Sequence, residues 1–500
     1  MVPYFLMERK MKKAKKNLAQ GVALLGLVAC AVGAGAQTAA SPAAAAAPAA
    51  QNLAEAVKKA INAHPEVQAR YHDFVSSLED KRIAGGGWRP QVNAQGWAGR
   101  EWRSNVPASP SYDWTRAGWS LELRQLIFDG GITSGFVKKY GFEKLSKFYD
   151  LRATSEALAD EVVNAYLDVQ RFRQTRALAQ DNYQVHQTTL GQLRERQQSG
   201  VGRGVDLEQA SGRLSLAQVN LMTESNNLND VAQRYRRVVG ESPAKTLDPV
   251  PAVAAGKLPH QLGAQDVGQA LRTSPVLLSK QALVQAAAAT QDAAKGAYAP
   301  KLEFRAATGR DRDLPTAFGN TSNIQSASVQ LLLTYNLYRG GADDARVRQV
   351  AAQNYAAQDV RDYTCRNVQQ NLSVAWNNIA RLRQQLPFLR EHELSTAKVR
   401  TAYTQQFQIG QRSLLDLLDT ENELFQARIA LVNAETDLKK YEYQWLTNAS
   451  QILQALGLAQ PYADSLPEEQ KELVLPDDIL RACQAELPDT SNLAPVAQAR

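Results

Sequence analysis

An internal duplication with a constant spacing of 210 residues constrains this 500-residue chain more than any other feature. Landmark residues of the first half recur in the second half at that one offset, with almost no net insertion between them. The matched positions include Pro65 and Pro275, Pro90 and Pro300, Gly130-Gly131 and Gly340-Gly341, Arg171 and Arg381, Gly200 and Gly410, and Asp206-Leu207 and Asp416-Leu417. Because this period is far longer than the roughly 20 to 50 residues of solenoid repeats, each copy must be a large structural unit.

The duplication and its flanking segments predict six parts along the chain. These are a signal peptide over residues 1–36, a flexible Ala/Pro-rich tether over 37–51, a first repeat over 52–240, a proline-rich linker over 241–263, a second repeat over 264–457 and a C-terminal tail over 458–500. The linker is expected to cross between the repeats at the middle of the molecule. The tail either wraps around the same region or remains disordered.

The first 36 residues have the order of charge, apolar core and small residues that is typical of a secretory signal. Four lysines between positions 12 and 16 precede the apolar residues 21–32, and an Ala-Gly-Ala triplet at 34–36 supplies an A-x-A cleavage site. We expect export of the chain and cleavage after Ala36. Met11 is an alternative start to Met1.

Cys30 permits a second interpretation of this leader. The sequence Leu27-Val28-Ala29-Cys30 resembles a lipoprotein cleavage box, in which case Cys30 would carry a lipid. The apolar residues continue past Cys30 toward the A-x-A site, which favours a cysteine that is discarded with the leader. Cys365 and Cys483 remain after processing, and the sequence leaves open whether they pair in an oxidising compartment.

The composition argues against nucleic-acid binding and against catalysis. The formal charge of +7 depends on the leader, because 51 basic and 49 acidic residues remain without residues 1–36. That balance is no electrostatic signature for nucleic acid. The five histidines show no ligand spacing with cysteines, and the glycines at 200–204 are not followed by the Lys-Ser/Thr pair of a phosphate loop. We therefore predict no enzyme, no metal and no cofactor.

Each repeat is predicted to contain a short amphipathic helix, two strands and a long helical hairpin, in that order. The helix is expected over residues 53–84 and again over 267–297. In the strand segments apolar and polar residues alternate, so that Leu302 and Phe304 fall on one face while Lys301 falls on the other. Such strands are typical of a transmembrane β-barrel with a wet lumen, although a soluble sandwich shows the same alternation. The signal peptide and the lack of further strands favour the barrel.

Four strands per chain are too few to close a barrel. An open sheet edge in hydrocarbon leaves unpaired backbone groups, each of which costs several kcal/mol. Bacterial barrels have at least about eight strands. Several copies of the chain are therefore predicted to share one barrel.

The helical stretches set the second dimension of the molecule. Residues 131–198 contain no proline, and a helix of this length is on the order of 100 Å long. Apolar residues recur at spacings of three and four, as at Leu158 and Val162, which predicts a narrow packing stripe. Pro387 is expected to bend the equivalent helix of the second copy. Because their polar faces cannot enter lipid, the helices are expected in the periplasm.

Three sets of duplicated motifs carry a family resemblance. They are Trp88-Arg89-Pro90 with Tyr298-Ala299-Pro300, Phe128-Asp129-Gly130-Gly131 with Tyr338-Arg339-Gly340-Gly341, and Gly410-Gln411-Arg412-Ser413-Leu414-Leu415-Asp416-Leu417-Leu418-Asp419. In this order they resemble the TolC-type family of outer-membrane ducts, over roughly residues 51–457. The resemblance implies an internally duplicated α+β membrane protein, a homotrimer in which four strands per chain form a 12-stranded barrel that a long periplasmic α-helical barrel continues.

The same resemblance implies roles for residues at the two hairpin turns. Gly200 and Gly410 are expected in the turns, and Arg412 is expected to pair across to Asp206 as a latch. Where the best-known members of the family have a tyrosine in this latch, the chain has Phe407, whose ring cannot donate a hydrogen bond.

Two acidic residues beyond the second turn are expected to line the periplasmic entrance as a ring. Asp416 and Asp419 are three residues apart and share one helix face. Carboxylates in a narrow mouth repel one another and favour cations. The alternative interpretation is that both are solvated surface acids.

Three functions are compatible with these predictions. The motifs most resemble ducts for type I protein secretion, a passive exit through the outer-membrane lipid that opens on contact with a periplasmic adaptor and an inner-membrane ABC transporter. The first alternative is a channel for drug or metal efflux, in which an RND pump replaces the ABC transporter. The second alternative is a periplasmic coiled-coil scaffold without transport.

Overall fold

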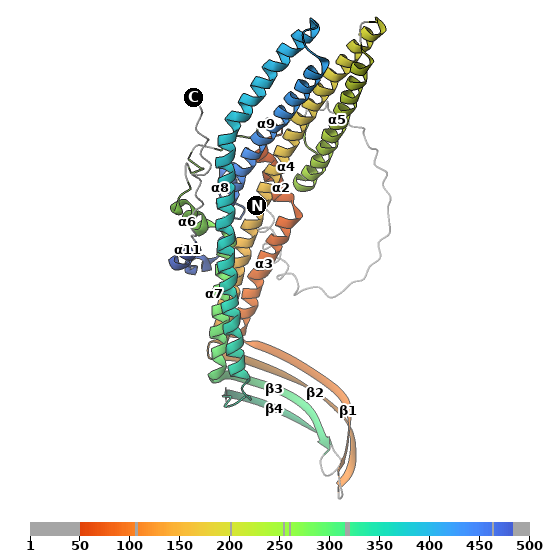
Figure 1. Ribbon diagram of the computed structural model, residues 1–500. Coiled ribbons are helices and arrows are strands. Elements are labelled where there is room, and N and C mark those ends of the chain that lie inside the picture. The colour runs from red at the N-terminus through yellow and green to blue at the C-terminus, as the bar shows by residue number, and fades with distance from the viewer. Residues whose placement is uncertain are drawn as a thin grey trace, which may run out of the picture. The chain divides into compact units, whose positions relative to one another are not determined.

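A computed structural model describes residues 51–105, 109–200, 203–253, 256–259, 262–315, 321–462 and 465–483 (Figure 1). The predicted signal peptide, the possible lipidation site Cys30 and nearly all of the tether lie outside the described residues. The described part consists of long helices and one four-stranded sheet.

The same series of elements occurs twice along the chain. The first series is α2 (Leu53–Ala63), α3 (Pro65–Gly85), η1 (Gly86–Trp88), β1 (Gln91–Asn105), β2 (Ser109–Phe128), α4 (Ile132–Gln198) and α5 (Gly204–Val239). The second is α6 (Ala264–Thr273), α7 (Pro275–Lys295), η2 (Gly296–Tyr298), β3 (Lys301–Pro315), β4 (Thr321–Thr334), α8 (Ala342–Gln408) and α9 (Leu414–Asn448), followed by α10 (Ile452–Ala455), η4 (Glu468–Glu472) and α11 (Asp477–Cys483). The predicted fold class, a duplicated α+β chain with four strands and long helices, is confirmed.

The prediction of a single short helix at the start of each repeat is wrong, because the structure has two helices there. The first break falls at His64, with φ −68° and ψ 128°, and the second at Ser274, with φ −63° and ψ 113°. A proline follows in both cases, and its ring disfavours the helical conformation of the residue before it. Pro65 and Pro275 then occupy the first position of the next helix, where no backbone N–H is needed.

The sheet is antiparallel in the order β1-β2-β3-β4, and its two faces differ in polarity. Arg124 lies opposite Gln91 on one side and opposite Arg305 on the other, which forms a polar row across three strands. On the opposite face Leu331 of β4 is 65% exposed within the single chain. The predicted period-two alternation therefore produces one hydrophilic and one apolar surface.

The long helices lie side by side, and the sheet is at one end of them (Figure 1). α4 and α8 have 67 residues each, which corresponds to roughly 100 Å. The assigned helix α8 runs without interruption through Pro387. Among the described residues, every helix is too short or too polar to cross a membrane.

The main apolar core lies in the middle of the helices and includes residues of both repeats. Tyr166 of α4 and Tyr235 of α5 are fully buried, and Trp376 of α8 packs edge-on against Trp445 of α9 at 6.0 Å. The linker joins this core, because the Tyr166 hydroxyl donates to the backbone oxygen of Asp248 at 2.8 Å.

The described part of the tail packs onto the helices. Cys483 of α11 forms a disulfide with Cys365 of α8, with their Cα atoms 5.9 Å apart, which answers the question that the sequence left open. The Tyr462 ring stacks on Tyr71 of α3 at 4.4 Å, and Glu469 pairs with Lys144 of α4 at 2.6 Å. Residues 465–483 thus follow the wrapped alternative, and residues 484–500 lie outside the described part.

Candidate functional site

The two hairpin turns lie at the end of the long helices that is opposite to the sheet (Figure 1). α4 ends at Gln198 and α8 ends at Gln408, and a glycine with positive φ follows each of them. These glycines are Gly200, with φ +79°, and Gly410, with φ +75°. A side chain at either position would be strained, since L-residues rarely adopt this left-handed conformation.

A small apolar core holds the two hairpins together near their turns. Its buried members come from α4, α5 and α9, and they are Leu190, Leu193, Ala210, Leu414 and Leu418. Phe407 of α8 packs against this core, and the Arg196 guanidinium lies over its ring at 5.1 Å from the centroid. At the position of the expected latch hydroxyl, the chain therefore has an apolar contact and a cation–π contact.

Arg412, expected to pair with Asp206, is held by its own hairpin within the single chain. Its guanidinium lies 4.4 Å from the centre of the Tyr403 ring, and its Nε donates to Gln406 at 3.1 Å. Its Nη1 is 3.6 Å from the Asp416 carboxylate. Among the described residues of one chain, Arg412 and Asp206 form no ion pair. Arg412 instead pairs with Asp416, which is four residues further along the same hairpin.

The two predicted ring acids each face an arginine. Asp416 lies in the first turn of α9, its N–H donates to the Ser413 hydroxyl at 3.2 Å, and its carboxylate is near Arg412. Asp419 accepts a hydrogen bond from Arg213 of α5. Arg213 was not among the site residues predicted from the sequence. Comparison of the repeats offers no signal for it, because its equivalent in the second copy is Glu423.

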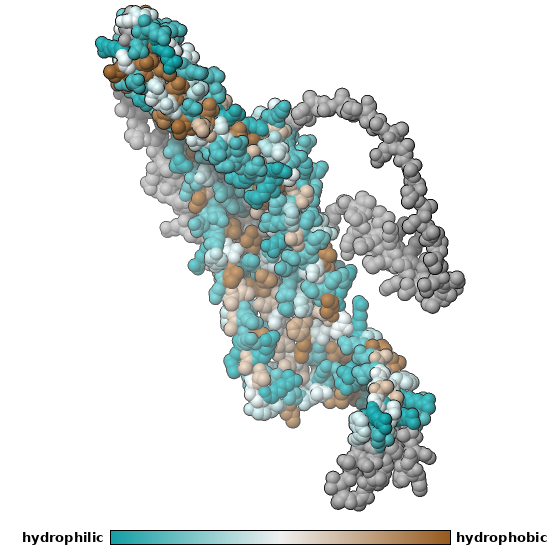
Figure 2. Space-filling model, turned by 90° about the vertical axis from the view of Figure 1, so that its right-hand side faces the viewer, coloured by the Kyte–Doolittle hydropathy of each residue, from teal (hydrophilic) through white to brown (hydrophobic). Residues whose placement is uncertain are grey.

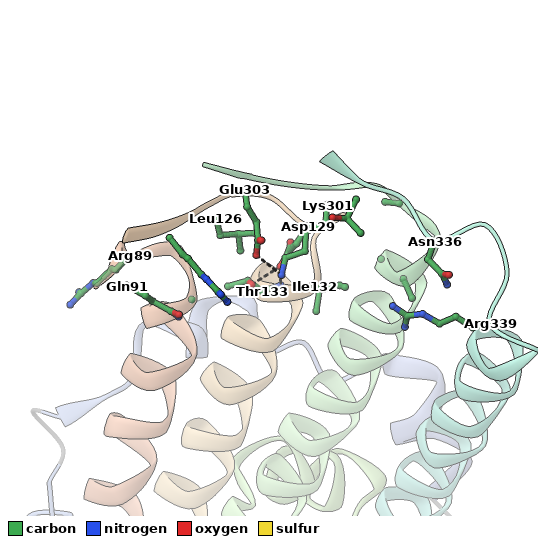
Figure 3. A pocket seen from close by; sticks show the side chains of 16 residues that line it. Arg89, Gln91, Leu126, Asp129, Ile132, Thr133, Lys301, Glu303, Asn336 and Arg339 are labelled. Atoms are coloured by element: carbon green, nitrogen blue, oxygen red, sulfur yellow. Dashed lines mark hydrogen bonds and ion pairs between the residues drawn. The ribbon is translucent and has the colours of Figure 1, made fainter. Parts of the chain in front are cut away.

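A polar recess of about 500 Å³ lies at the base of the sheet, where the strands meet the helices (Figure 3). Asp129, which is 5% exposed, forms part of its wall. One oxygen of this carboxylate accepts the Gly131 N–H at 3.1 Å, and the other accepts the Thr133 N–H at 2.8 Å. These bonds satisfy backbone N–H groups at the start of α4, which explains the acid in the first copy of the Gly-Gly motif; the second copy has Arg339 at this position.

The charged side chains around this recess are of both signs. They are Arg89, Arg124, Lys301 and Arg339 against Asp129 and Glu303. Glu303 pairs with Lys301 at 2.6 Å and with Arg305 at 2.8 Å. The recess is thus lined by charged side chains of the polar sheet face and by residues of the turns between sheet and helices. Apolar side chains, among them Leu126 and Ile132, complete the lining.

Between the sheet and the turns, α4 carries two buried acidic residues, Glu156 and Asp168, and the half-buried Asp160. Burial raises the pKa of Glu156 to about 7 and the pKa of Asp160 to about 6, since water solvates a carboxylate better than the interior does. Asp168 is surrounded by cations from three helices, namely Arg171, Arg234 and Lys440. Within the described residues, no group of three His, Cys, Asp or Glu side chains is placed to hold a metal ion.

The model of the outer membrane efflux protein family matches residues 56–241 and 267–458 of this chain. The two matched segments correspond to the two series of structural elements and together cover most of the chain. The chain belongs to the outer membrane efflux protein family.

Relatives and solved structures agree with this membership. The outer membrane efflux protein BepC of Brucella suis is 28% identical over 398 residues, which are 79% of this chain and 84% of BepC. The outer membrane protein TolC of Escherichia coli is 21% identical, over 82% of both chains. The fold is similar to that of the Campylobacter jejuni CmeC outer membrane channel, with a TM-score of 0.70 and 15% identity over 85% of this chain and 90% of CmeC.

These findings confirm the predicted location in the outer membrane, with the long helices in the periplasm. The chain is an outer-membrane transport channel, and this class of protein forms passages for cargo. A soluble periplasmic scaffold does not fit that location.

Proposed function

We propose that three copies of this chain close one 12-stranded barrel and one helical barrel, which together form the exit duct of a tripartite transport system. The open sheet carries this proposal. β1 and β4 each pair with one neighbouring strand, so both edges of the sheet are left with unpaired backbone groups. Such edges are not tolerated in hydrocarbon, and pairing of β4 with β1 of the next copy removes them.

The outermost long helices support the same assembly. α8 exposes Tyr355 by 66%, Tyr363 by 63% and Phe388 by 58%. α5, at the other side, exposes Met222 by 65% and Val219 by 57%. Figure 2 shows apolar patches along otherwise hydrophilic helices on the face that it presents. In a ring of identical chains, apolar side chains on both outermost helices would be buried at the interfaces between neighbouring chains.

The helical hairpin turns form the periplasmic entrance in this proposal. Asp416 and Asp419 of the three chains line the mouth as the acidic ring. Since Arg412 is held by Asp416 within one chain, we place the latch between Arg412 of one copy and Asp206 of the next. Asp206 lies in the first turn of α5, where the helix dipole is favourable for an acidic side chain.

The duct is passive, and its energy comes from partners. A periplasmic adaptor opens the entrance, and an inner-membrane ABC transporter drives the cargo. We propose type I protein secretion as the first cargo class, because the motifs after the second strands and at the second turn resemble secretion ducts. BepC is named as an efflux protein, which favours drug or metal efflux with an RND pump as the second candidate.

Deletion of the protein in its native cell separates these candidates. We would compare culture supernatants by quantitative mass spectrometry and measure growth against a panel of drugs and metal salts. Loss of one or a few large secreted proteins, restored by the wild-type chain, supports type I secretion. An unchanged supernatant with higher sensitivity supports efflux. No change in either measurement contradicts a transport duct.

A further inference from the structure

Arg213 connects the first helical hairpin to the second near their turns. It lies in the third turn of α5, and its Nη2 donates to the carboxylate of Asp419 on α9. The Arg213 side chain is 32% exposed, and that of Asp419 is 54% exposed. The pair is therefore open to water on one side and flanked by the apolar core at the turns on the other, because Leu214 and Leu418 are sequence neighbours of its two members.

A buried histidine of α4 lies within electrostatic range of Arg213. His186 of α4 is 3% exposed, and its pKa is lowered, first by burial and then by the charge of Arg213. The lowered pKa favours the neutral imidazole near pH 7, so that His186 adds no positive charge to that of Arg213. Arg213 is thus the counter-ion of one of the two carboxylates that the entrance would present.

The contact also has a defined place in the duplicated architecture. Positions equivalent to Arg213 and Asp419 in the other repeat hold Glu423 and Gln209. The contact between the hairpins is therefore asymmetric: the pair links α5 of the first repeat to α9 of the second, and the equivalent positions form no second pair of this kind. A movement that separates α5 from α9 breaks it, whereas a rigid movement of both hairpins leaves it intact.

We propose that Arg213 is the residue that sets the ion selectivity of the entrance, by neutralising Asp419 while the two hairpins are together. Separation of the hairpins uncovers one carboxylate per chain, and the open mouth becomes more attractive to cations. This inference rests on the proposed position of the entrance at the hairpin turns. Charges within about 8 to 10 Å of a permeating ion act before salt screens them, so that one charge per chain is sufficient.

The test is single-channel recording of the purified full-length protein in planar lipid bilayers under a potassium chloride gradient. The variants are Arg213→Ala, Arg213→Lys, Asp419→Asn and the double variant Arg213→Ala/Asp419→Asn. Arg203→Ala is the matched control, since Arg203 is the exposed N-cap residue just before the same helix. It removes one positive charge near the turn without touching the pair.

We expect Arg213→Ala to raise the potassium-to-chloride permeability ratio about threefold, from the Coulomb energy of one uncovered charge at a few ångströms in water. Asp419→Asn lowers the ratio, the double variant returns it close to the wild type, and Arg213→Lys preserves it. Equal changes of the permeability ratio in Arg213→Ala and Arg203→Ala, or no change in Arg213→Ala, would overturn the inference. If the wild-type protein still forms a pore, that result would leave the proposed duct unaffected. Absence of any wild-type pore would overturn the proposed function, and this inference with it.

Discussion

The two longest helices, α4 and α8, are equivalent in the duplication and equal in length, yet they are buried to very different extents. Of 67 residues each, α4 buries 25 and α8 buries 13. Leu145 of α4 is fully buried, while its equivalent in α8, Tyr355, is 66% exposed. α4 packs against α3, α5, α7 and α9, whereas α8 packs mainly against α7 and α9. The duplication thus preserves the path of the backbone, and position at the centre or the side of the chain decides which copy is covered.

The turns between sheet and helix show the same contrast. A Cβ added to Gly130 would lie 2.5 Å from the backbone oxygen of Gly296, whereas a Cβ added to Gly340 meets nothing within 4 Å. The first turn is therefore packed against the second repeat. The second turn has no such cover in the single chain, which we interpret as a surface that a neighbouring copy completes.

The largest expected effect comes from truncating the same position in the two helices. We expect Leu145→Ala to lower the free energy of unfolding by about 2 to 5 kcal/mol, because it leaves a cavity in a closed core. Tyr355→Ala should leave the fold of the chain nearly unchanged and weaken the association between chains. Thermal unfolding by circular dichroism and semi-native electrophoresis of the detergent-extracted protein measure the two effects separately.

Equal destabilisation of the fold by both substitutions would contradict this distinction. It would mean that the exposed side of α8 is covered within one chain. Leu145→Met is the control for the core position, since it conserves volume and should cost less than about 1.5 kcal/mol.

The second prediction concerns Glu156, for which the equivalent residue on the exposed helix is Arg366. Burial raises its pKa from 4.5 to about 7 in the fold, so folding favours the protonated acid. Stability is then highest below about pH 4.5 and falls as pH rises to about 7, by roughly 3 kcal/mol for a shift of this size. Glu156→Gln should raise the melting temperature at pH 8 and change it little at pH 4.5.

The measurement is thermal unfolding across this pH range, with the exposed Glu195→Gln on the same helix as control. A variant that is destabilised equally at pH 4.5 and pH 8 would show that Glu156 acts through hydrogen bonding, and would contradict the burial argument.

The third prediction compares Gly130→Ala with Gly340→Ala. Both glycines have positive φ, +69° and +63°, so each substitution costs about 1 to 2 kcal/mol in backbone strain. Gly130→Ala additionally forces a methyl group against Gly296 and Ala299, which adds about 1 to 3 kcal/mol. Denaturant unfolding of the two variants in detergent gives the difference. Equal losses would indicate that the packed turn relaxes freely.

The smallest effect on stability is expected for Arg412→Ala. Its ion pair with Asp416 is exposed, and such pairs contribute about 0.2 to 1 kcal/mol. Loss of the proposed latch should nevertheless increase ion leakage through the duct. Single-channel conductance measures it, with the exposed Arg194→Ala as control. Unchanged conductance in Arg412→Ala would argue against a role in closure.

Those parts of the fold that depend on local patterns were predictable from the sequence. The constant offset between repeats indicated the order of the elements, and the alternation around Leu302 indicated which strand face is apolar. The helix break at His64 was not predicted, because the apolar pattern continues across Pro65. The proline itself indicates the break, since the residue before a proline disfavours the helical conformation. Local rules are weak where two of them conflict.

Contacts between distant segments were not predictable in the same way. The pairing of Cys365 with Cys483 depends on how the tail folds back over 118 residues, and spacing alone does not determine it. The Arg213 contact with Asp419 has no counterpart in the other repeat, so the duplication provided no hint. The family resemblance suggested Asp206 as the partner of Arg412, whereas within one chain Arg412 pairs with the nearby Asp416.

The central claim is that one chain forms only part of the barrel and that three copies close it. Native mass spectrometry of the full-length protein, extracted from outer membranes in detergent, tests this most directly. We predict a single assembly with three times the mass of the mature chain, which dissociates to monomers in Tyr355→Ala more readily than in the wild type. A folded monomer in the membrane extract, with no trimer, would contradict the account.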